Sequence, residues 1–402
     1  MLLALLFQGS VLNAQIDPTK RSLINFGYNQ PLVGSSPLAG YVFYYLNKPN
    51  LYKNMTARFA IAPGYVDSEF GFKDALGKNI DLGISLAGGA FADSYTEIRQ
   101  GDLVREESFT GHGGEIGVNI YGLLNPDQKI PLHAILKNTV HYATYLRDSA
   151  TPGSFALPPN HAEVETRAGL RFAGREPKLF PSVGMEISIW YQGDFRMDDG
   201  PYGYSGDRRL ERQSHMFWNY SSLTYTFPKS QQGFNVSMAL GTGLNMDRTN
   251  VYRLGGQLPF ISEFPFDIPG YYFQEISADR FALFGAQYMI PLGLSKKWAV
   301  NMFGNHAQVH YLSGLEQPGD HHSGAGSGIT YISSRKAWKV NLAYSYGFDA
   351  IRNKGRGAHA IGLLLQYDFT RSDSIERVVE PEMNPRKSRG FDRIISPRSI
   401  NR

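Results

Sequence analysis

No cysteine occurs among the 402 residues, which excludes a disulfide framework, thiolate metal sites and a cysteine nucleophile. The formal net charge is only +4, so neither composition nor charge indicates a nucleic-acid-binding protein. Helical periodicity is nearly absent. A mainly disordered chain is also excluded, because 25 Phe, 24 Tyr and 4 Trp supply far more apolar surface than such chains carry.

The two ends of the chain differ from the rest. Residues 1–14, MLLALLFQGSVLNA, resemble the apolar core and cleavage region of a secretory signal peptide, and a short buried helix is the alternative. No later stretch approaches the ~18 to 20 apolar residues of a membrane-spanning helix. Residues 370–402 combine charges and prolines with scarcely any alternation, which predicts a disordered periplasmic tail. The chain is therefore expected to be exported.

Alternation of apolar and small or polar residues dominates residues 15–369 and predicts an all-β protein. Many segments have 10 to 14 residues, as tilted strands that cross a bilayer require. We predict a transmembrane antiparallel β-barrel; a secreted β-sandwich is the alternative, but its outer face would carry more Lys and Glu. About sixteen strands are predicted, at 22–30, 38–46, 53–63, 65–72, 80–92, 107–122, 131–146, 161–173, 182–195, 212–227, 233–245, 278–291, 297–311, 323–332, 336–347 and 357–369.

Turn lengths and aromatic residues favour the bacterial outer membrane. Short polar turns alternate with long loops at 93–106, 147–160, 196–211 and 246–277, as in an outer-membrane barrel with short turns on one rim. Aromatic residues near strand ends are expected to form interfacial girdles, namely Tyr41, Phe43, Tyr44, Tyr45, Trp190 and Tyr191. The last strand alternates and ends on Phe369, and so resembles the C-terminal assembly signal of outer-membrane barrels. The resemblance implies that the barrel-assembly machinery and outer-membrane lipid are its partners.

The loop at 246–277 carries a second resemblance. It begins with Val-Tyr-Arg253-Leu-Gly255-Gly256, continues through Gly, Pro and aromatic residues, and is followed by five predicted strands. This pattern resembles the bacterial surface-antigen barrel family, which includes the outer-membrane protein assembly factor and the two-partner secretion transporters. The resemblance implies a sixteen-stranded barrel whose loop between strands eleven and twelve folds into the lumen. Strands begin almost directly after the leader, so no periplasmic client-binding module is expected.

The apolar groups of that loop also favour a place inside the lumen, because an exposed patch of this size promotes aggregation. A buried Arg253 then needs a partner, and the candidates are the carboxylates of Glu186 or Asp368, or an aromatic face.

Charged residues recur on three consecutive predicted strands, opposite the apolar face of each. They are His133, Lys137, His141, Glu163, Glu165, Arg167, Arg171 and Glu186. In a barrel they converge on one side of the lumen, either as a pore lining or solute site, or as a salt-bridged network that stiffens the interior. The network is the favoured interpretation, because charges of both signs commonly fill a lumen.

Residues 320–323, Asp-His-His-Ser, together with His310 and Ser313, raise the alternative of an outer-membrane lipid hydrolase. Neighbours on a strand face opposite ways, and no Gly-x-Ser-x-Gly elbow is present, so we expect no enzyme activity. His306 and His310 share a face but lie about 13 Å apart, too far to share zinc. We expect no metal or other cofactor. The sequence thus predicts a transport or pore barrel with a lumen loop, whose solute or client it does not identify.

Overall fold

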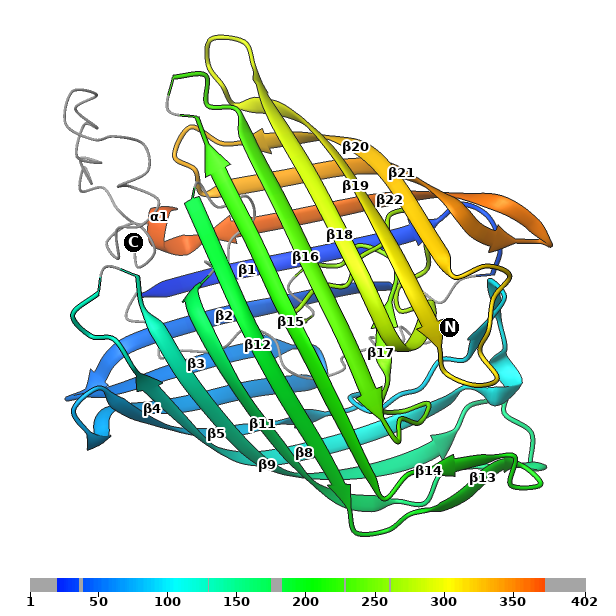
Figure 1. Ribbon diagram of the computed structural model, residues 1–402. Helices are drawn as coiled ribbons and strands as arrows, with labels where there is room; N and C mark the ends of the chain where they lie inside the picture. The colour runs from blue at the N-terminus through cyan, green and yellow to red at the C-terminus, as the bar shows by residue number, and fades with distance from the viewer. Residues whose placement is uncertain are drawn as a thin grey trace.

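The computed structural model describes residues 20–35, 39–128, 130–174, 183–227, 229–259 and 262–372. They form one antiparallel sheet that closes on itself, with small additions at one rim (Figure 1). The predicted signal peptide at 1–14 lies outside the described residues. So does the predicted tail, apart from residues 370–372 in the short helix α1 (Phe369–Ser372). Within the described ranges, no helix is long and apolar enough to cross a membrane.

The barrel has 16 strands, as predicted. They are β1 (Arg21–Pro31), β2 (Ala39–Tyr52), β3 (Met55–Ala62), β4 (Tyr65–Gly77), β5 (Ile80–Gly89), β8 (Phe109–Leu123), β9 (Leu132–Arg147), β11 (His161–Gly174), β12 (Val183–Arg196), β15 (Gln213–Thr226), β16 (Gly233–Leu244), β18 (Ile276–Leu292), β19 (Trp298–Tyr311), β20 (His321–Ile332), β21 (Trp338–Arg352) and β22 (Gly355–Asp368).

The first and last strands close the barrel. Strand β1 pairs with β2 on one side and with β22 on the other, in a register that runs from Leu23 opposite Asp368 to Pro31 opposite Ala360. Closure leaves the long strands without a free edge, whose unpaired backbone groups could not be satisfied in lipid. The closed sheet excludes the β-sandwich alternative.

The two faces of the sheet explain the sequence alternation. On the outer wall large apolar side chains are exposed, for example Leu170, Ile189, Phe284 and Leu342, each 40% or more accessible. A water-soluble surface rarely carries so many, whereas lipid covers them without cost. The inner face carries glycine, polar and charged residues, together with buried aromatic rings. The outer wall is thus the surface of a transmembrane barrel, and the predicted fold class is confirmed.

The aromatic girdles differ in part from those predicted. Tyr41, Phe43, Tyr45 and Trp190 face inward and are buried, so the expectation that they belong to a girdle was wrong. Their direct neighbours Tyr44 and Tyr191 point outward instead, because successive residues on a strand alternate between its two faces.

One outward girdle lies at the rim of the short turns. Here Trp298 packs on Tyr331 at 4.9 Å between ring centroids, and Trp338 packs on Tyr367 at 4.5 Å. Such amphipathic rings are typical of the membrane–water interface.

The four long loops lie at the opposite rim, which also carries two tight turns at 63–64 and 353–354. Short elements that the sequence did not predict occur in these loops. They are β6 (Ile98–Arg99), β7 (Asp102–Leu103), the 3-10 helix η1 (Arg105–Glu107), β10 (Phe155–Ala156), β13 (Gly200–Tyr204), β14 (Arg208–Leu210) and β17 (Tyr252–Leu254). Strands β10, β13 and β14 form a separate small sheet at the long-loop rim.

Candidate functional site

The predicted charged residues come from the neighbouring strands β9, β11 and β12. In the register, Lys137 stands opposite Arg167, and His133 stands opposite Arg171. Leu170, one residue before Arg171, is exposed on the outer wall, so the charged set faces the interior. We call this set the charged wall; its members are His133, Lys137, His141, Glu163, Glu165, Arg167, Arg171 and Glu186.

Ion pairs join members of the charged wall to one another. Arg171 Nε lies 3.0 Å from a carboxylate oxygen of Glu186, and both side chains are less than 10% exposed. Arg167 lies 3.3 Å from Glu165, and its guanidinium also donates to Gln192 at 2.7 and 3.1 Å. Both arginines therefore have an acceptor on their own or the neighbouring strand.

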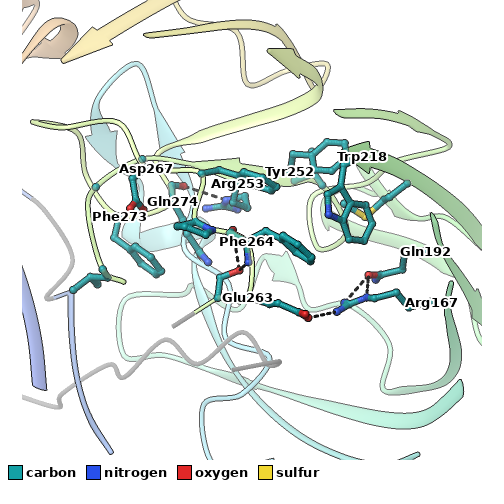
Figure 2. A pocket seen from close by; sticks show the side chains of 18 residues that line it. Arg167, Gln192, Trp218, Tyr252, Arg253, Glu263, Phe264, Asp267, Phe273 and Gln274 are labelled. Carbon is teal, nitrogen blue, oxygen red and sulfur yellow. Dashed lines mark hydrogen bonds and ion pairs between the residues drawn. The ribbon is translucent and has the colours of Figure 1, made fainter. Parts of the chain in front are cut away.

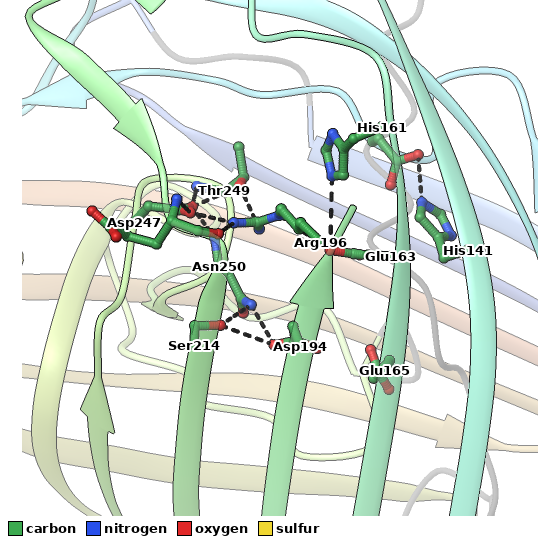
Figure 3. A network of polar contacts seen from close by, with 12 residues as sticks. His141, His161, Glu163, Glu165, Asp194, Arg196, Ser214, Asp247, Thr249 and Asn250 are labelled. Atoms are coloured by element: carbon green, nitrogen blue, oxygen red, sulfur yellow. Dashed lines mark hydrogen bonds and ion pairs between the residues drawn. The ribbon is translucent and has the colours of Figure 1, made fainter. Parts of the chain in front are cut away.

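Toward the long-loop rim, the charged wall continues into a second network (Figure 3). Glu163 accepts a hydrogen bond from Arg196 at 3.2 Å, and Arg196 also pairs with Asp247 of the loop after β16. His141 lies 3.0 Å from Asp93 of the loop after β5. Arg196 and Asp247 were not predicted as site residues, and two long loops are thus anchored to the wall by opposite charges.

Residues 245–275, between β16 and β18, form a loop that contacts several strands of the barrel; we call it the inner loop. The Pro259 carbonyl accepts a hydrogen bond from the Tyr41 hydroxyl of β2, and the Asp267 carbonyl accepts one from Asn305 of β19. Glu263 contacts β11. Figure 1 shows the inner loop in yellow-green between the walls, in agreement with these contacts to separate strands.

Glu263 is the residue of the inner loop with the most cationic neighbours. Its carboxylate lies 2.6 Å from Arg171 Nη2 and 3.8 Å from Lys137 Nζ. It also lies 3.7 Å from Arg167 Nη1, the contact that Figure 2 shows. Burial alone raises the pKa of this carboxyl, but the charges of the three cations outweigh it and hold the pKa below the usual value of glutamate. Glu263 therefore stays ionised inside the barrel.

Phe264, the next residue, anchors the inner loop through aromatic contacts. Its ring lies 5.4 Å from Trp190, 5.6 Å from Trp218 and 5.7 Å from Tyr220, measured between centroids. The largest apolar cluster combines such inward-facing rings with side chains of the inner loop. Burial of one large side chain of this kind contributes roughly 1.5–3 kcal/mol.

Arg253 contacts an aromatic face, which is one of the kinds of partner predicted for it. Its guanidinium carbon lies 5.3 Å from the ring centroid of Tyr95, and it donates to the carbonyls of Gln274 at 3.1 Å and Thr96 at 3.0 Å. Glu186, one of the carboxylates proposed from sequence, binds Arg171 instead. Of the alternatives, the aromatic face is the one that the structure shows.

Gly255 and Gly256 allow the inner loop to fold back on itself. A Cβ at Gly255 would lie 2.1 Å from the carbonyl oxygen of Tyr272, and one at Gly256 would lie 2.6 Å from that of Tyr271. The Gly256 amide donates to the Tyr272 carbonyl at 2.8 Å. Glycine at both positions is thus required by a close backbone approach.

A buried ion pair fixes the end of the inner loop to the rim. Arg352 of β21 binds Glu275 through both terminal nitrogens, at 2.6 and 2.8 Å, and its guanidinium lies 3.5 Å from the ring centroid of Tyr272. Both charged side chains are at most 1% exposed. A bidentate pair of this geometry fixes the relative orientation of the guanidinium and the carboxylate as well as the distance between them.

A cavity of about 200 Å³ separates part of the inner loop from the wall (Figure 2). Arg167, Gln192, Trp218, Arg253 and Glu263 are among its lining residues. Polar and aromatic groups thus meet in one space that belongs to the interior of the barrel. In the part of the chain that the structure describes, no group of three His, Asp or Glu side chains is placed to hold a metal ion.

The histidine-rich stretch at 320–323 divides between the two faces of the wall. His322 is buried and contacts the Tyr271 hydroxyl of the inner loop at 3.0 Å, whereas His321 is exposed on the outside. His306 of β19 stands directly opposite Ser323 of β20, and their side chains are 2.9 Å apart. These residues were singled out from the sequence, but the sequence does not reveal that His306 and Ser323 pair across neighbouring strands.

The geometry defines a closed transmembrane β-barrel whose longest loop contacts its charged inner face. Solved structures with this fold include CdiB from Acinetobacter baumannii, at TM-score 0.56 and 9% identity over 87% of this chain and 60% of that chain. BamA from Haemophilus ducreyi lacking POTRA domains 1–3 matches at TM-score 0.55 and 11% identity, over 87% of this chain and 71% of that chain. CdiB from Escherichia coli matches at 0.54 and 10%, over 86% and 63%.

These similarities confirm the predicted resemblance to surface-antigen barrels at the level of the fold. The chain spans less than two thirds of the length of either CdiB structure. No family model and no curated protein match the sequence.

Proposed function

We propose that this protein is a transport or pore barrel of the bacterial outer membrane whose lumen is closed by the inner loop. The observation that carries the proposal is the position of Glu263, which is held by Arg171, Arg167 and Lys137 of the charged wall. A loop carboxylate surrounded by three wall cations acts as a latch, because its release leaves unpaired charge on both sides.

The proposal assigns a structural role to the charged wall. Its two arginines, Lys137, His141 and its three glutamates are paired with one another, with Arg196 of β12 or with loop residues. Such pairing suits a docking surface for the inner loop better than a site for a free solute. Transport through the barrel needs no chemical step, so no catalytic group is assigned to this function. A small solute and a client protein are both compatible cargo.

The outer-membrane location is supported by the apolar outer wall and by closure of the sheet. In this arrangement the long-loop rim faces the exterior and the short-turn rim faces the periplasm. We expect the protein to fractionate with the outer membrane and to migrate faster on gels unless it is boiled. Recovery in the soluble periplasmic fraction would refute the location.

The latch is tested by single-channel conductance in planar bilayers. Glu263→Arg places a fourth cation against the wall, so we expect more frequent opening than in the wild-type protein. Glu106→Gln is the matched control, because Glu106 is an exposed carboxylate in η1. If Glu263→Arg opens no more often than Glu106→Gln, Glu263 does not hold the lumen closed.

A further inference from the structure

A chain of polar contacts lies on the outer wall, separate from the lumen. Ser323 Oγ is 2.9 Å from His306 Nδ1, and His306 Nε2 is 3.4 Å from His321 Nδ1. The two imidazole rings are stacked, with centroids 5.4 Å apart and an interplanar angle of 21°. His321 Nε2 in turn lies 3.8 Å from Asp320.

The order of atoms in this chain suits proton transfer. His306 Nδ1 accepts the Ser323 hydroxyl proton when its Nε2 carries hydrogen, and His321 Nδ1 is the group that faces that Nε2–H. Asp320 lies beyond, 3.8 Å from His321 Nε2. A serine, a base within hydrogen-bonding reach and a third group that orients the base are the parts of an activated nucleophile.

The height of Ser323 on the wall places it at a membrane boundary. Along the outer face of β19, Trp298 belongs to the short-turn girdle, Met302 is apolar and exposed, and His306 begins the polar part. Eight residues separate Trp298 from His306, which at ~3.3 Å each and a tilt of ~40° is about 20 Å of height. The apolar band of such barrels is ~25 Å tall, so His306 lies close to its far edge.

A row of small residues lies directly beside the Ser323–His306 pair, on its membrane side. In the register, Ala286 stands opposite Gly304, and Gly304 stands opposite Ala325, whereas Phe284 flanks His306 in the row above. A Cβ at Gly304 would make only ordinary contacts, with the Gly324 carbonyl oxygen at 3.4 Å and Ala325 Cβ at 3.6 Å, so no bulky side chain covers its backbone. This row leaves room for an acyl chain against the wall.

We propose that this outer-wall site cleaves the ester bond of an acyl chain in a membrane lipid, with Ser323 as nucleophile and His306 as general base. The lipid class is an ester-linked fatty acyl group at the leaflet facing the long-loop rim; phospholipid and lipid A both supply it. The site rests on the proposed orientation of the barrel but not on the latch. This proposal differs from the expectation of a barrel without enzyme activity. That expectation considered neighbours on one strand, which face opposite ways, whereas the base His306 comes from the strand next to that of Ser323.

The reaction uses water as its only co-substrate. Ser323 Oγ attacks the acyl carbonyl carbon while its proton passes to His306 Nδ1, and the bond to the alcohol oxygen breaks as His306 returns the proton to it. Water then attacks the acyl-serine, again with His306 as base, and the fatty acid leaves with Ser323 restored. His321 is a positioning residue that holds the His306 tautomer.

Labelling of the full-length protein in detergent with a fluorophosphonate probe tests the nucleophile. We expect an adduct on Ser323 that is lost in Ser323→Ala and kept in Ser327→Ala, an exposed serine on the same face of β20. Heat-modifiable migration verifies that each variant is folded. Absence of the adduct in the wild type, or its persistence in Ser323→Ala, overturns the proposal.

Fatty-acid release from vesicles identifies the substrate. Phosphatidylethanolamine vesicles, with and without lipid A, separate the two sources, and His306→Gln should lower release by ~10²–10⁴-fold. His321→Gln should lower kcat and shift its pH profile with KM unchanged, which a purely structural role would not do. No release from either lipid overturns the proposal. Glu263→Arg should leave labelling intact, so failure of the latch and failure of this site are distinguishable.

Discussion

Glu263 and Arg171 are 92 residues apart in sequence, yet the Glu263 carboxylate lies 2.6 Å from Arg171 Nη2. Both side chains are less than 10% exposed. The contact joins the inner loop to the charged wall, because Arg171 also binds Glu186 of the next strand. In the proposed function, closure of the lumen therefore depends on the ionisation of a loop carboxylate.

Acid is expected to release the inner loop. The pKa of Glu263 is held below its usual value by Lys137, Arg171 and Arg167 against the effect of burial, and Glu263 belongs to a loop rather than to a barrel strand. Because the pKa of Glu263 in the closed state is lower than the ~4.3 of a free glutamate, its ionised carboxylate stabilises the closed state above about pH 4.3. This contribution is lost as the pH falls through the pKa of Glu263 in the closed state. Conductance should rise below pH ~4, and Glu263→Gln should flatten this dependence. An unchanged acid response in Glu263→Gln would contradict the assignment.

Arg167→Ala tests whether the charged wall is structural. The change removes the partner of Gln192 and Glu165 and leaves Glu263 with two cations. Loss of these buried contacts should destabilise the barrel by about 1–3 kcal/mol and lower the temperature of heat modification. Ion selectivity should change little. A shift in selectivity with unchanged heat resistance would instead support a pore lining.

Arg253→Ala should also destabilise the barrel. The side chain stacks on Tyr95 and donates to the carbonyls of Gln274 and Thr96, so its loss should cost about 2 kcal/mol in the free energy of unfolding. Arg253→Lys keeps the cation over the ring but loses the fork of donors, and an intermediate effect is expected. Urea unfolding followed by tryptophan fluorescence measures all three proteins. Equal stability of Arg253→Ala and the wild type would mean that these contacts contribute nothing.

The strands could be predicted because each carries its own two-faced pattern. All sixteen predicted segments overlap a barrel strand, and the last differs only at its ends, since Phe369 starts α1 instead of ending β22. The short strands β10, β13 and β14 were missed, because two to five residues are too few to show a period.

The site was predicted less completely, for a physical reason. Shared parity on consecutive strands was enough to group the charged wall, since neighbouring strands pair in order. Glu263 has no such pattern, and its place depends on a loop that returns across the barrel. The one sequence feature that could have indicated its role is that it is a carboxylate among the apolar residues of the inner loop. The Ser323–His306 contact likewise depends on the exact register of β19 and β20.

The topology predicts where the C-terminus lies. Leu23 near the start of β1 stands opposite Asp368 at the end of β22, so both ends of the barrel are at the short-turn rim. An epitope placed after Arg402 should therefore be protected from protease in intact cells and cleaved after the outer membrane is permeabilised. Cleavage in intact cells would mean that the orientation is reversed.

Deletion of residues 250–272 tests the central claim most directly. This change removes Glu263, Phe264 and Arg253 together and leaves the barrel strands intact. Single-channel conductance in planar bilayers should increase severalfold over the wild-type protein, with heat-modifiable migration retained as proof of a folded barrel. If the folded deletion variant conducts no more than the wild type, the inner loop does not close the lumen.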